Sequence, residues 1–565
     1  MKWLLILTLA AGAAGADRRN TETPNTDTRT SFVAPDTLEA WKARGDALRR
    51  QILAAAGLWP APPKHPLTVL FAGRVERDGY TVEKVAIETL PGFWLGGNLY
   101  RPKEPGRRPA ILHPHGHWPY GRLENSALCS TPALGENFAR HGFVLFAYDM
   151  LGYNDTVQVP HDFTGPQYQL WNFTPLGLQL WNSIRAADFL ESLPDVDPAR
   201  LAMTGASGGG TQTFLMAAVD GRLAAAAPVN MVSGLMQGGC VCENAPGLRI
   251  GTNNIETAAL FAPRPMLLVS ATGDWTREVP KVEFPAMRKV WELYGQPDRL
   301  EAVQFDAPHN YNKESREAVY EFFRKRLTPE QPAWRERNAA VEKLQDMLVF
   351  HGRRLPEGAL SFEELFAQWK RTARAAARRM SAEEARERLR VAFSWERRPK
   401  LEVLPARWHE GRTPAVLLLH PDGMAAAEHS EEFRALRAAG RAVLVIDLFQ
   451  TGSAVAPRDR SHRHFLTFNV SDDAGRVQDA AAAIEELARR TKQPVEVRAT
   501  GRARWWALFA AAIAGAPARF EAVAEEFDED EERLAREFFV PGLLHAGGVE
   551  SALRAGSASA AQFRK

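Results

Sequence analysis

Cysteine is scarce in this 565-residue chain, which has three, at positions 129, 240 and 242. Three cysteines are too few for a disulfide framework or a structural zinc site. In an oxidising compartment they could still form one bridge. Because Cys240 and Cys242 are only two positions apart, a bridge from Cys129 to one of them is a more favourable hypothesis than a bridge between those two, and the sequence leaves open whether Cys129 pairs with Cys240 or Cys242.

A strong charge imbalance and long apolar runs are also missing. The net charge is +2, which creates no field suited to nucleic acid. No run after the N-terminus approaches the ~20 apolar residues of a membrane helix. These absences exclude nucleic acid as a partner and exclude insertion into a membrane. The chain is 45% hydrophobic and 24% charged, as in soluble globular proteins, and its length predicts two or more domains.

The first 16 residues have the plan of a cleaved secretory signal. Lys2 precedes an apolar run over residues 3–10, and small residues follow at 14–16. We therefore predict a signal peptide over residues 1–16 and a secreted or periplasmic protein. Residues 17–35 are rich in Thr, Asn, Asp and Arg, which predicts a disordered leader.

Residues 36–328 alternate short apolar runs with helix-like segments. This alternation predicts an α/β fold, a doubly wound and mostly parallel sheet. In such a sheet, catalytic groups follow the carboxyl ends of the strands. The predicted strands of this series are residues 109–113, 143–148, 200–204, 224–228, 265–270 and 301–305.

Residues 205–209, Gly-Ala-Ser-Gly-Gly, follow one of these runs and precede a helix-like segment. Taken alone, such a cluster is also typical of an ordinary turn. The pattern Gly-x-Ser-x-Gly has a steric meaning, however, because only small neighbours let strand and helix approach a strained serine. The pattern predicts that Ser207 is a nucleophile on a strand-to-helix elbow.

Two later residues complete a triad. Asp274 follows the run at 265–270, and His309 follows the run at 301–305. Either residue alone would be ordinary in a loop, but the chain order Ser, Asp, His is that of α/β-hydrolases. For the oxyanion hole we predict the backbone N–H groups of Gly208 and of His117, which lies in the loop after residues 109–113.

The same loop carries three histidines, His113, His115 and His117, and could be taken for a metal site. It offers no cysteine or carboxylate at ligand spacing. We therefore expect no metal and no other cofactor.

Together these motifs resemble the α/β-hydrolase superfamily, and more closely its exported bacterial acetyl xylan esterases and dienelactone hydrolase-related esterases. The resemblance covers residues 36–328 and implies a serine esterase that de-esterifies plant-type polysaccharide such as acetylated xylan. The known acetyl xylan esterases usually have Gln where this chain has Gly208. The matching segments are residues 115–118, 148–153, 205–209, 240–249, 271–275 and 309–312.

The substrate is a less specific prediction. Flat aromatic faces suit sugar rings, so Trp118, Trp171 and Trp275 are candidate substrate contacts. Some similar sugar-acid esterases place the triad acid at the position of Glu243. A glucuronoyl-type esterase is therefore the alternative, with Arg249 or Arg277 facing a uronate carboxylate.

Residues 329–400 are rich in Ala, Arg and Glu with Leu at helical spacing, which predicts a helical linker. Residues 401–565 then repeat the first domain: 412–423 match 108–116, and 438–447 match 139–149.

In this repeat Ala503 falls opposite Ser207. An alanine cannot act as a nucleophile. We predict a truncated, noncatalytic α/β-hydrolase-like domain that packs on the catalytic domain or on another chain, because an incomplete sheet exposes an edge.

Two further functions fit parts of the pattern. A serine peptidase of the prolyl-oligopeptidase type shares Gly-x-Ser-x-Gly-Gly, although no recognisable propeller precedes the domain. A noncatalytic binding protein on a hydrolase scaffold also fits. The sequence leaves the acyl group, the alcohol and the oligomeric state open.

Overall fold

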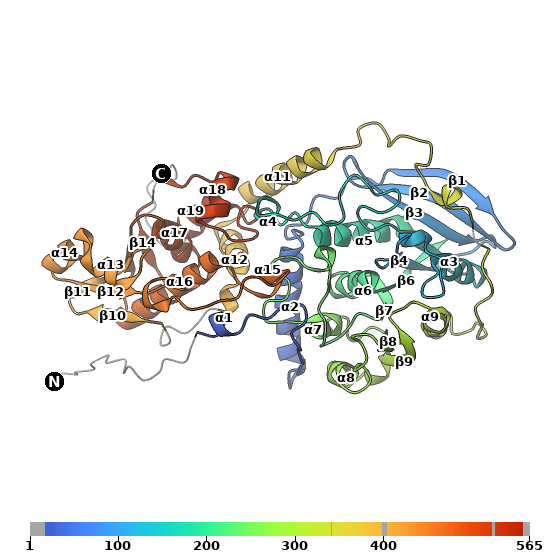
Figure 1. The fold of residues 1–565 in the computed structure, drawn as a ribbon, viewed down its shortest axis with the longest axis horizontal. Helices are drawn as coiled ribbons and strands as arrows, with labels where there is room; N and C mark the ends of the chain where they lie inside the picture. The colour runs from blue at the N-terminus through green and yellow to red at the C-terminus, as the bar shows by residue number, and fades with distance from the viewer. Residues whose placement is uncertain (1–16, 341, 398–403, 523–525, 558–565) are drawn as a thin grey trace. The chain divides into compact units, whose positions relative to one another are not determined.

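The computed structural model describes residues 17–340, 342–397, 404–522 and 526–557, so the predicted signal peptide lies outside the described residues. The chain divides into two compact units (Figure 1). The large unit comprises residues 26–164 and 173–369, and the small unit comprises residues 1–25, 165–172 and 370–565. Each unit contains its own α/β sheet, which confirms the predicted fold class.

The sheet of the large unit has nine strands in the order β1-β2-β3-β5-β4-β6-β7-β8-β9. In this order, the six strands β5, β4, β6, β7, β8 and β9 are parallel to one another. Strands β1, β2 and β3 continue the sheet beyond β5, and each of them pairs antiparallel with its neighbours. Every predicted parallel strand is present. The bounds are β1 (Val69–Glu76), β2 (Tyr80–Leu90), β3 (Phe93–Pro102), β4 (Arg108–Pro114), β5 (Val144–Tyr148), β6 (Val196–Ala206), β7 (Leu223–Val229), β8 (Met266–Gly273) and β9 (Leu300–Pro308).

Helices cover both faces of this sheet (Figure 1). Strands β4 and β5 are buried on both faces, as their continuous apolar sequences require. Among the residues described, no helix combines the length and apolar character needed to cross a membrane. The helices are α2 (Leu38–Ala55), α3 (Thr131–Arg140), α5 (Pro175–Ser192), α6 (Gly208–Val219), α7 (Asn254–Ala259), α8 (Glu283–Leu293) and α9 (Lys313–Leu327).

A segment predicted to be helical instead runs mostly without helix along the large unit. Of the described residues between 329 and 361, which leave out residue 341, only α10 (Leu344–Met347) is helical. Trp334 stacks on His141 with ring centroids 3.8 Å apart. Beyond this segment, α11 (Phe362–Arg378) and α12 (Ala382–Ala392) are helices as predicted.

A buried ion network anchors this segment. The Arg122 side chain is fully buried and forms ion pairs with Asp149 and, at 2.5 Å, with Asp155. The Asp155 carboxylate also accepts hydrogen bonds from the backbone N–H groups of Val349 (2.8 Å) and Phe350 (2.9 Å). Desolvation by burial raises the pKa of Asp149 to about 6, against the opposing charge of Arg122.

The small unit has five strands in the order β10-β12-β11-β13-β14. Strand β10 is antiparallel to β12, and the other pairs are parallel. This is the order and sense of β3-β5-β4-β6-β7 in the large unit, so the repeat seen in the sequence is a repeat of topology. The bounds are β10 (Ala406–His409), β11 (Arg412–Leu419), β12 (Arg441–Ile446), β13 (Val495–Ala499) and β14 (Ala518–Phe520).

Residues 17–35, predicted as a disordered leader, make defined contacts. Asp17 caps the short helix α1 (Arg18–Thr21). Arg19 forms a 2.9 Å ion pair with Asp479, whose side chain is fully buried and needs a cation close by. In the large unit, the backbone N–H of Thr30 donates to the Gly234 carbonyl at 2.7 Å. The prediction of disorder rested on local composition alone. It was wrong because the residues that hold this segment, such as Asp479 and Gly234, lie far along the chain.

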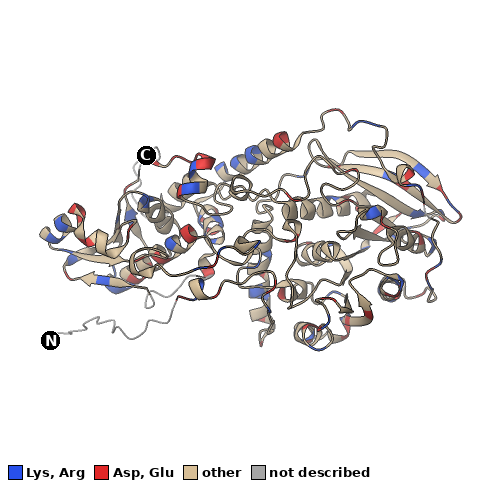
Figure 2. Cartoon of the chain, viewed as in Figure 1, with Lys and Arg blue, Asp and Glu red and all other residues tan. Residues whose placement is uncertain are grey.

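Charged side chains are distributed evenly. Figure 2 shows basic and acidic residues interspersed over the elements of each unit rather than gathered by sign. This agrees with the net charge of +2.

Asp155→Ala should lower the free energy of unfolding by about 3–5 kcal/mol, because it leaves Arg122 buried with one partner fewer. Urea unfolding of the full chain, followed through the transition of the large unit, measures this loss. Glu292→Ala is the matched control. Glu292 pairs with Arg288 at 3.8 Å on the surface, with side chains 54% and 43% exposed, and its loss should change stability by about 0.5 kcal/mol or less. Equal losses in the two variants would contradict the role of the network.

Candidate active site

Ser207 lies at the turn between β6 and α6 with φ 58° and ψ −124°. A non-glycine residue in this region costs about 1–3 kcal/mol, so the surrounding structure must hold it there. Its backbone N–H donates to the Val229 carbonyl at 3.1 Å, and its carbonyl accepts from the N–H of Thr211 at 3.0 Å. The backbone of Ser207 therefore has the strained geometry that the Gly-x-Ser-x-Gly pattern predicts.

The flanking glycines are required by backbone contact. A Cβ atom on Gly205 would lie 2.5 Å from the Pro114 carbonyl oxygen, and one on Gly209 would lie 2.3 Å from the same atom. On the facing loop, a Cβ on Gly116 would lie 2.7 Å from the Ala206 carbonyl oxygen and 3.2 Å from the Ser207 Cβ. The loop after β4 thus packs directly on the serine turn.

Asp274 and His309 meet at the ends of β8 and β9. The His309 Nδ1 lies 2.8 Å from Asp274 Oδ2. Asp274 Oδ1 accepts hydrogen bonds from the Thr276 N–H (2.7 Å) and hydroxyl (2.5 Å), which fix the carboxylate. When Nδ1–H donates to this carboxylate, Nε2 carries the lone pair. Within the described part of the chain, Nε2 has no hydrogen-bond partner.

Further hydrogen bonds hold the histidine loop beside the serine turn. The hydroxyl groups of Thr204 and Tyr311 are 2.8 Å apart. The Asn230 side chain donates to the Asn310 carbonyl at 2.9 Å. Thr204 lies three residues before Ser207, and Asn310 directly follows His309, so these bonds bring the two catalytic candidates to the same edge of the sheet.

Two indole rings flank His309. The Trp118 ring is nearly parallel to the imidazole with centroids 6.0 Å apart, and the Trp275 ring lies at 4.4 Å. Both tryptophans are half-buried, whereas the Asp274 carboxylate is almost fully buried. The structure therefore places two of the three predicted tryptophans against the predicted histidine.

The predicted oxyanion donors lie in the same region. Among the described residues, the backbone N–H groups of Gly208 and His117 form no hydrogen bond. A Cβ on Gly208 would lie 2.6 Å from Cε1 and 2.9 Å from Nδ1 of His117, so the imidazole ring covers this glycine. Within the described structure, both N–H groups therefore lack a protein acceptor.

Two of the three loop histidines have structural roles. His113 Nδ1 lies 2.8 Å from the Thr204 carbonyl. His115 Nδ1 lies 2.7 Å from the Gly116 carbonyl, and its Nε2 accepts from the Met150 N–H at 3.0 Å. Burial lowers the pKa of His113 to about 4 and that of His115 to about 3, so both are neutral at physiological pH.

The third histidine joins a cluster that the sequence did not predict. His117, His161, Cys240 and Cys242, here called the His/Cys cluster, place their ligand atoms within 4.8 Å of one another. Hydrogen bonding from Cys242, and then from His117 and His161, lowers the pKa of Cys240 despite its burial, whereas burial raises the pKa of Cys242. The cysteines lie more than 120 positions beyond His117, so no local ligand spacing in the sequence reveals the cluster.

The structure contradicts the hypothesis of a disulfide bridge, since all three cysteines are free. Cys129 is buried elsewhere, in a β-bridge with Tyr311, where desolvation raises the pKa of its thiol to about 12. Cys240 and Cys242 face the two histidines instead.

Glu243, the alternative acid, is buried and bonded elsewhere. Its carboxylate accepts from the Thr211 hydroxyl (2.9 Å) and from the N–H groups of Gly239 (3.0 Å) and Cys240 (3.1 Å). In the described structure His309 bonds to Asp274 and not to Glu243. Glu243 therefore shapes the loop that carries the two cysteines.

The three remaining predicted substrate contacts lie in different surroundings. Arg277 is exposed and donates to the Asp274 carbonyl at 3.3 Å. Arg249 is buried and donates to the Glu243 carbonyl and to Asn254, which makes it a loop support rather than a surface contact. Trp171 as a substrate contact is wrong, because it is buried in the small unit and donates to Glu531 at 2.9 Å.

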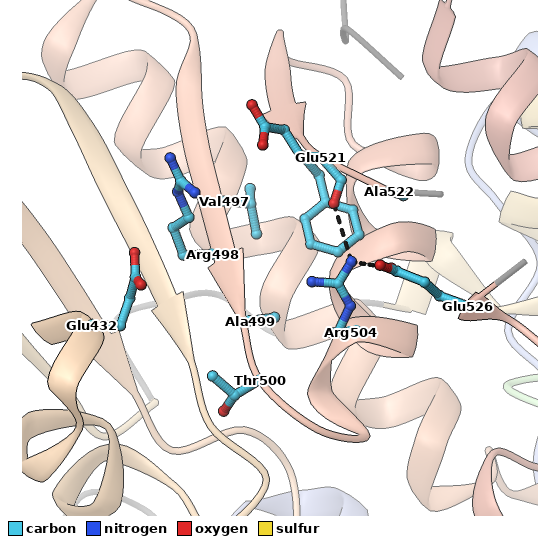
Figure 3. Close-up of a pocket in the computed structure, with 10 residues that line it drawn as sticks. Glu432, Val497, Arg498, Ala499, Thr500, Arg504, Glu521, Ala522 and Glu526 are labelled. Carbon is cyan, nitrogen blue, oxygen red and sulfur yellow. Dashed lines mark hydrogen bonds and ion pairs between the residues drawn. The ribbon is translucent and has the colours of Figure 1, made fainter. Parts of the chain in front are cut away.

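The small unit has a different turn at the equivalent place. The residue with positive φ between β13 and α17 (Ala503–Ile513) is Gly501, at 51°, and Ala503 is the buried first residue of the helix. A pocket of about 380 Å³ opens at the ends of β13 and β14 (Figure 3). Among the described residues that line it there is no serine, histidine or cysteine: they are Glu432, Val497, Arg498, Ala499, Thr500, Arg504, Phe520, Glu521, Ala522 and Glu526.

Comparison with known proteins places the chain among hydrolases. No family model matches the chain. The solved structure of Methylesterase BT1017 is 30% identical, with a TM-score of 0.51, and the match covers 60% of this chain and 76% of that one. YtaP of Bacillus subtilis (strain 168), which is described as a hydrolase, is 26% identical over 187 residues, 31% of this chain and 60% of its own length. A glucuronoyl esterase from Solibacter usitatus is 16% identical with a TM-score of 0.41, covering 54% of this chain and 99% of that one.

Gly209→Ala should destabilise the large unit by about 1–3 kcal/mol, because the added methyl group collides with the Pro114 carbonyl. Alanine in a helix is otherwise favoured over glycine by about 1 kcal/mol, so the sign of the effect reports the backbone contact. Thermal unfolding of the full chain measures it. Gly221→Ala is the control, since nothing lies within 4 Å of the added atom. A stabilised Gly209→Ala protein would refute the close approach.

Proposed function

The chain belongs to the α/β-hydrolase superfamily, and we propose on this basis that its large unit is a serine carboxylic-ester hydrolase. The observation that carries the proposal is the 2.8 Å contact between His309 Nδ1 and Asp274 Oδ2, with Nε2 left without a partner among the described residues. The strained backbone of Ser207 and the free N–H groups of Gly208 and His117 support it.

In the proposed reaction the Ser207 hydroxyl attacks the ester carbonyl while His309 Nε2 takes its proton. Asp274 holds the imidazole in the required tautomer and stabilises its positive charge. The N–H groups of Gly208 and His117 donate hydrogen bonds to the developing oxyanion. His309 then returns the proton to the leaving alkoxide, and water releases the acyl group by the same steps in reverse.

For the substrate we propose an ester of a carbohydrate. The indole faces of Trp118 and Trp275 beside His309 are suited to sugar rings. The resemblance to a methylesterase favours a methyl ester of a sugar acid. An acetyl ester such as acetylated xylan is the second candidate, supported by the sequence motifs. The predicted signal peptide supports action outside the cytoplasm.

A serine peptidase and a noncatalytic scaffold have less support. The described residues before β1 contain only α1 and α2, so they offer no propeller of the prolyl-oligopeptidase type. A noncatalytic scaffold leaves unexplained both the contact between His309 and Asp274 and the strained backbone of Ser207.

Ser207→Ala should lower the rate of p-nitrophenyl acetate hydrolysis at least about 10³-fold and abolish labelling by a fluorophosphonate, because the nucleophile is removed. Labelling separates an enzyme from a noncatalytic scaffold. Full esterase activity in the Ser207→Ala protein would disprove the mechanism.

Asp274→Asn should lower kcat about 10⁴-fold, since it stabilises the wrong imidazole tautomer. Glu243→Gln should have a much smaller effect, because Glu243 contacts the cysteine loop and not His309. Initial rates at matched enzyme concentration provide the comparison. The opposite ranking would make Glu243 the triad acid.

Acetylated xylan and the methyl ester of glucuronate, assayed in parallel, decide between the two substrate classes. We expect the methyl ester to give the higher kcat/KM. Preference for acetylated xylan would assign the site to deacetylation.

A further inference from the structure

We propose that the His/Cys cluster binds one zinc ion, or a similar divalent metal ion, beside the serine turn. The cluster is formed by Nε2 of His117, Nε2 of His161 and the Sγ atoms of Cys240 and Cys242. Two imidazole nitrogens and two sulfurs are a complete ligand set for a structural zinc site. The proposed ester hydrolysis does not require it.

The distances suit a tetrahedral ion. Zinc bonds of about 2.0–2.3 Å place neighbouring ligand atoms about 3.3–3.8 Å apart. The two Nε2 atoms are 3.1 Å apart, His117 Nε2 is 3.1 Å from Cys242 Sγ, and Cys240 Sγ is 3.3 Å from His161 Nε2. Small outward movements of these side chains would open the ion's place at the centre.

The tautomer of His161 also suits a metal. Its Nδ1 lies 2.8 Å from the Leu151 carbonyl, which can only accept, so Nδ1 carries the proton. The lone pair of Nε2 is then directed at the other three ligands. A hydrogen bond from the second nitrogen to a backbone carbonyl is the usual way in which proteins orient a metal-binding histidine.

The loop that carries the cysteines is held in place. The Glu243 carboxylate accepts from the N–H groups of Gly239 and Cys240, and the Arg249 guanidinium donates to the Glu243 carbonyl at 2.9 Å. Both side chains are buried. The two thiols are therefore presented by a fixed turn, and Cys242 itself is buried.

A metal here would join three loops around the proposed nucleophile. His117 follows β4, His161 lies in the loop after β5, and the cysteines lie in the loop after β7. An ion on Nε2 forces the proton of neutral His117 onto Nδ1. The Nδ1 edge of that ring covers Gly208, so the ion would fix the ring next to an oxyanion donor.

The first test is metal analysis of the full chain, purified without chelators and supplied with Zn²⁺. We expect one zinc ion per chain, and its loss in Cys240→Ser and Cys242→Ser. Cys129→Ser is the matched control, because Cys129 is a free buried cysteine outside the cluster, and it should keep the metal. Absence of zinc from the unmodified chain, or equal loss in the Cys129→Ser protein, would overturn the proposal.

A second measurement does not depend on how the variants fold. The unmodified chain, stripped of metal and loaded with Co²⁺, should show the intense visible bands of tetrahedral cobalt and a thiolate-to-cobalt charge-transfer band. Weak octahedral bands without charge transfer would contradict the site. Mass spectrometry that found a Cys240–Cys242 disulfide in the metal-supplied protein would also overturn it. None of these readouts depends on esterase activity.

Discussion

Backbone contact between the end of β4 and the turn after β6 is the constraint on which the site depends. The Pro114 carbonyl oxygen lies so close to Gly205 and Gly209 that neither can carry a side chain. This approach brings the loop after β4 onto the serine turn, and three features follow from it. The backbone of His117 follows the close contact of Gly116 with the serine turn, the ring of His117 covers Gly208, and Trp118 reaches His309.

The parts of the molecule that follow from local physics could be predicted from the sequence. Strands buried on both faces must be continuous apolar runs, so their positions and alternation with helices predicted the sheet. Parallel strands end at one edge, which is why the sequence alone could pair Asp274 with His309, whose side chains meet at 2.8 Å. The two glycines around Ser207 predicted its positive φ for steric reasons.

The features that the sequence did not predict depend on contacts between residues far apart in the chain. Such contacts leave no periodic pattern in the sequence. Cys240 and Cys242 reach His117 only because the loops after β4 and β7 meet. Trp171 has the flat aromatic ring of a sugar contact. It belongs to the small unit, however, where Glu531 accepts its indole N–H. Arg19 looked like part of a polar leader because its partner, Asp479, lies 460 positions away.

The shared topology of the two sheets has a consequence for the chemistry that the small unit can carry out. The strands common to both are β3 to β7 and β10 to β14, and the described part of the second sheet has no counterpart of β8 and β9. The proposed acid and base stand on those two missing strands. Among the described residues, the second sheet therefore offers no strand end for an acid or a base of the first kind, so even a serine in place of Ala503 would have no triad to join there.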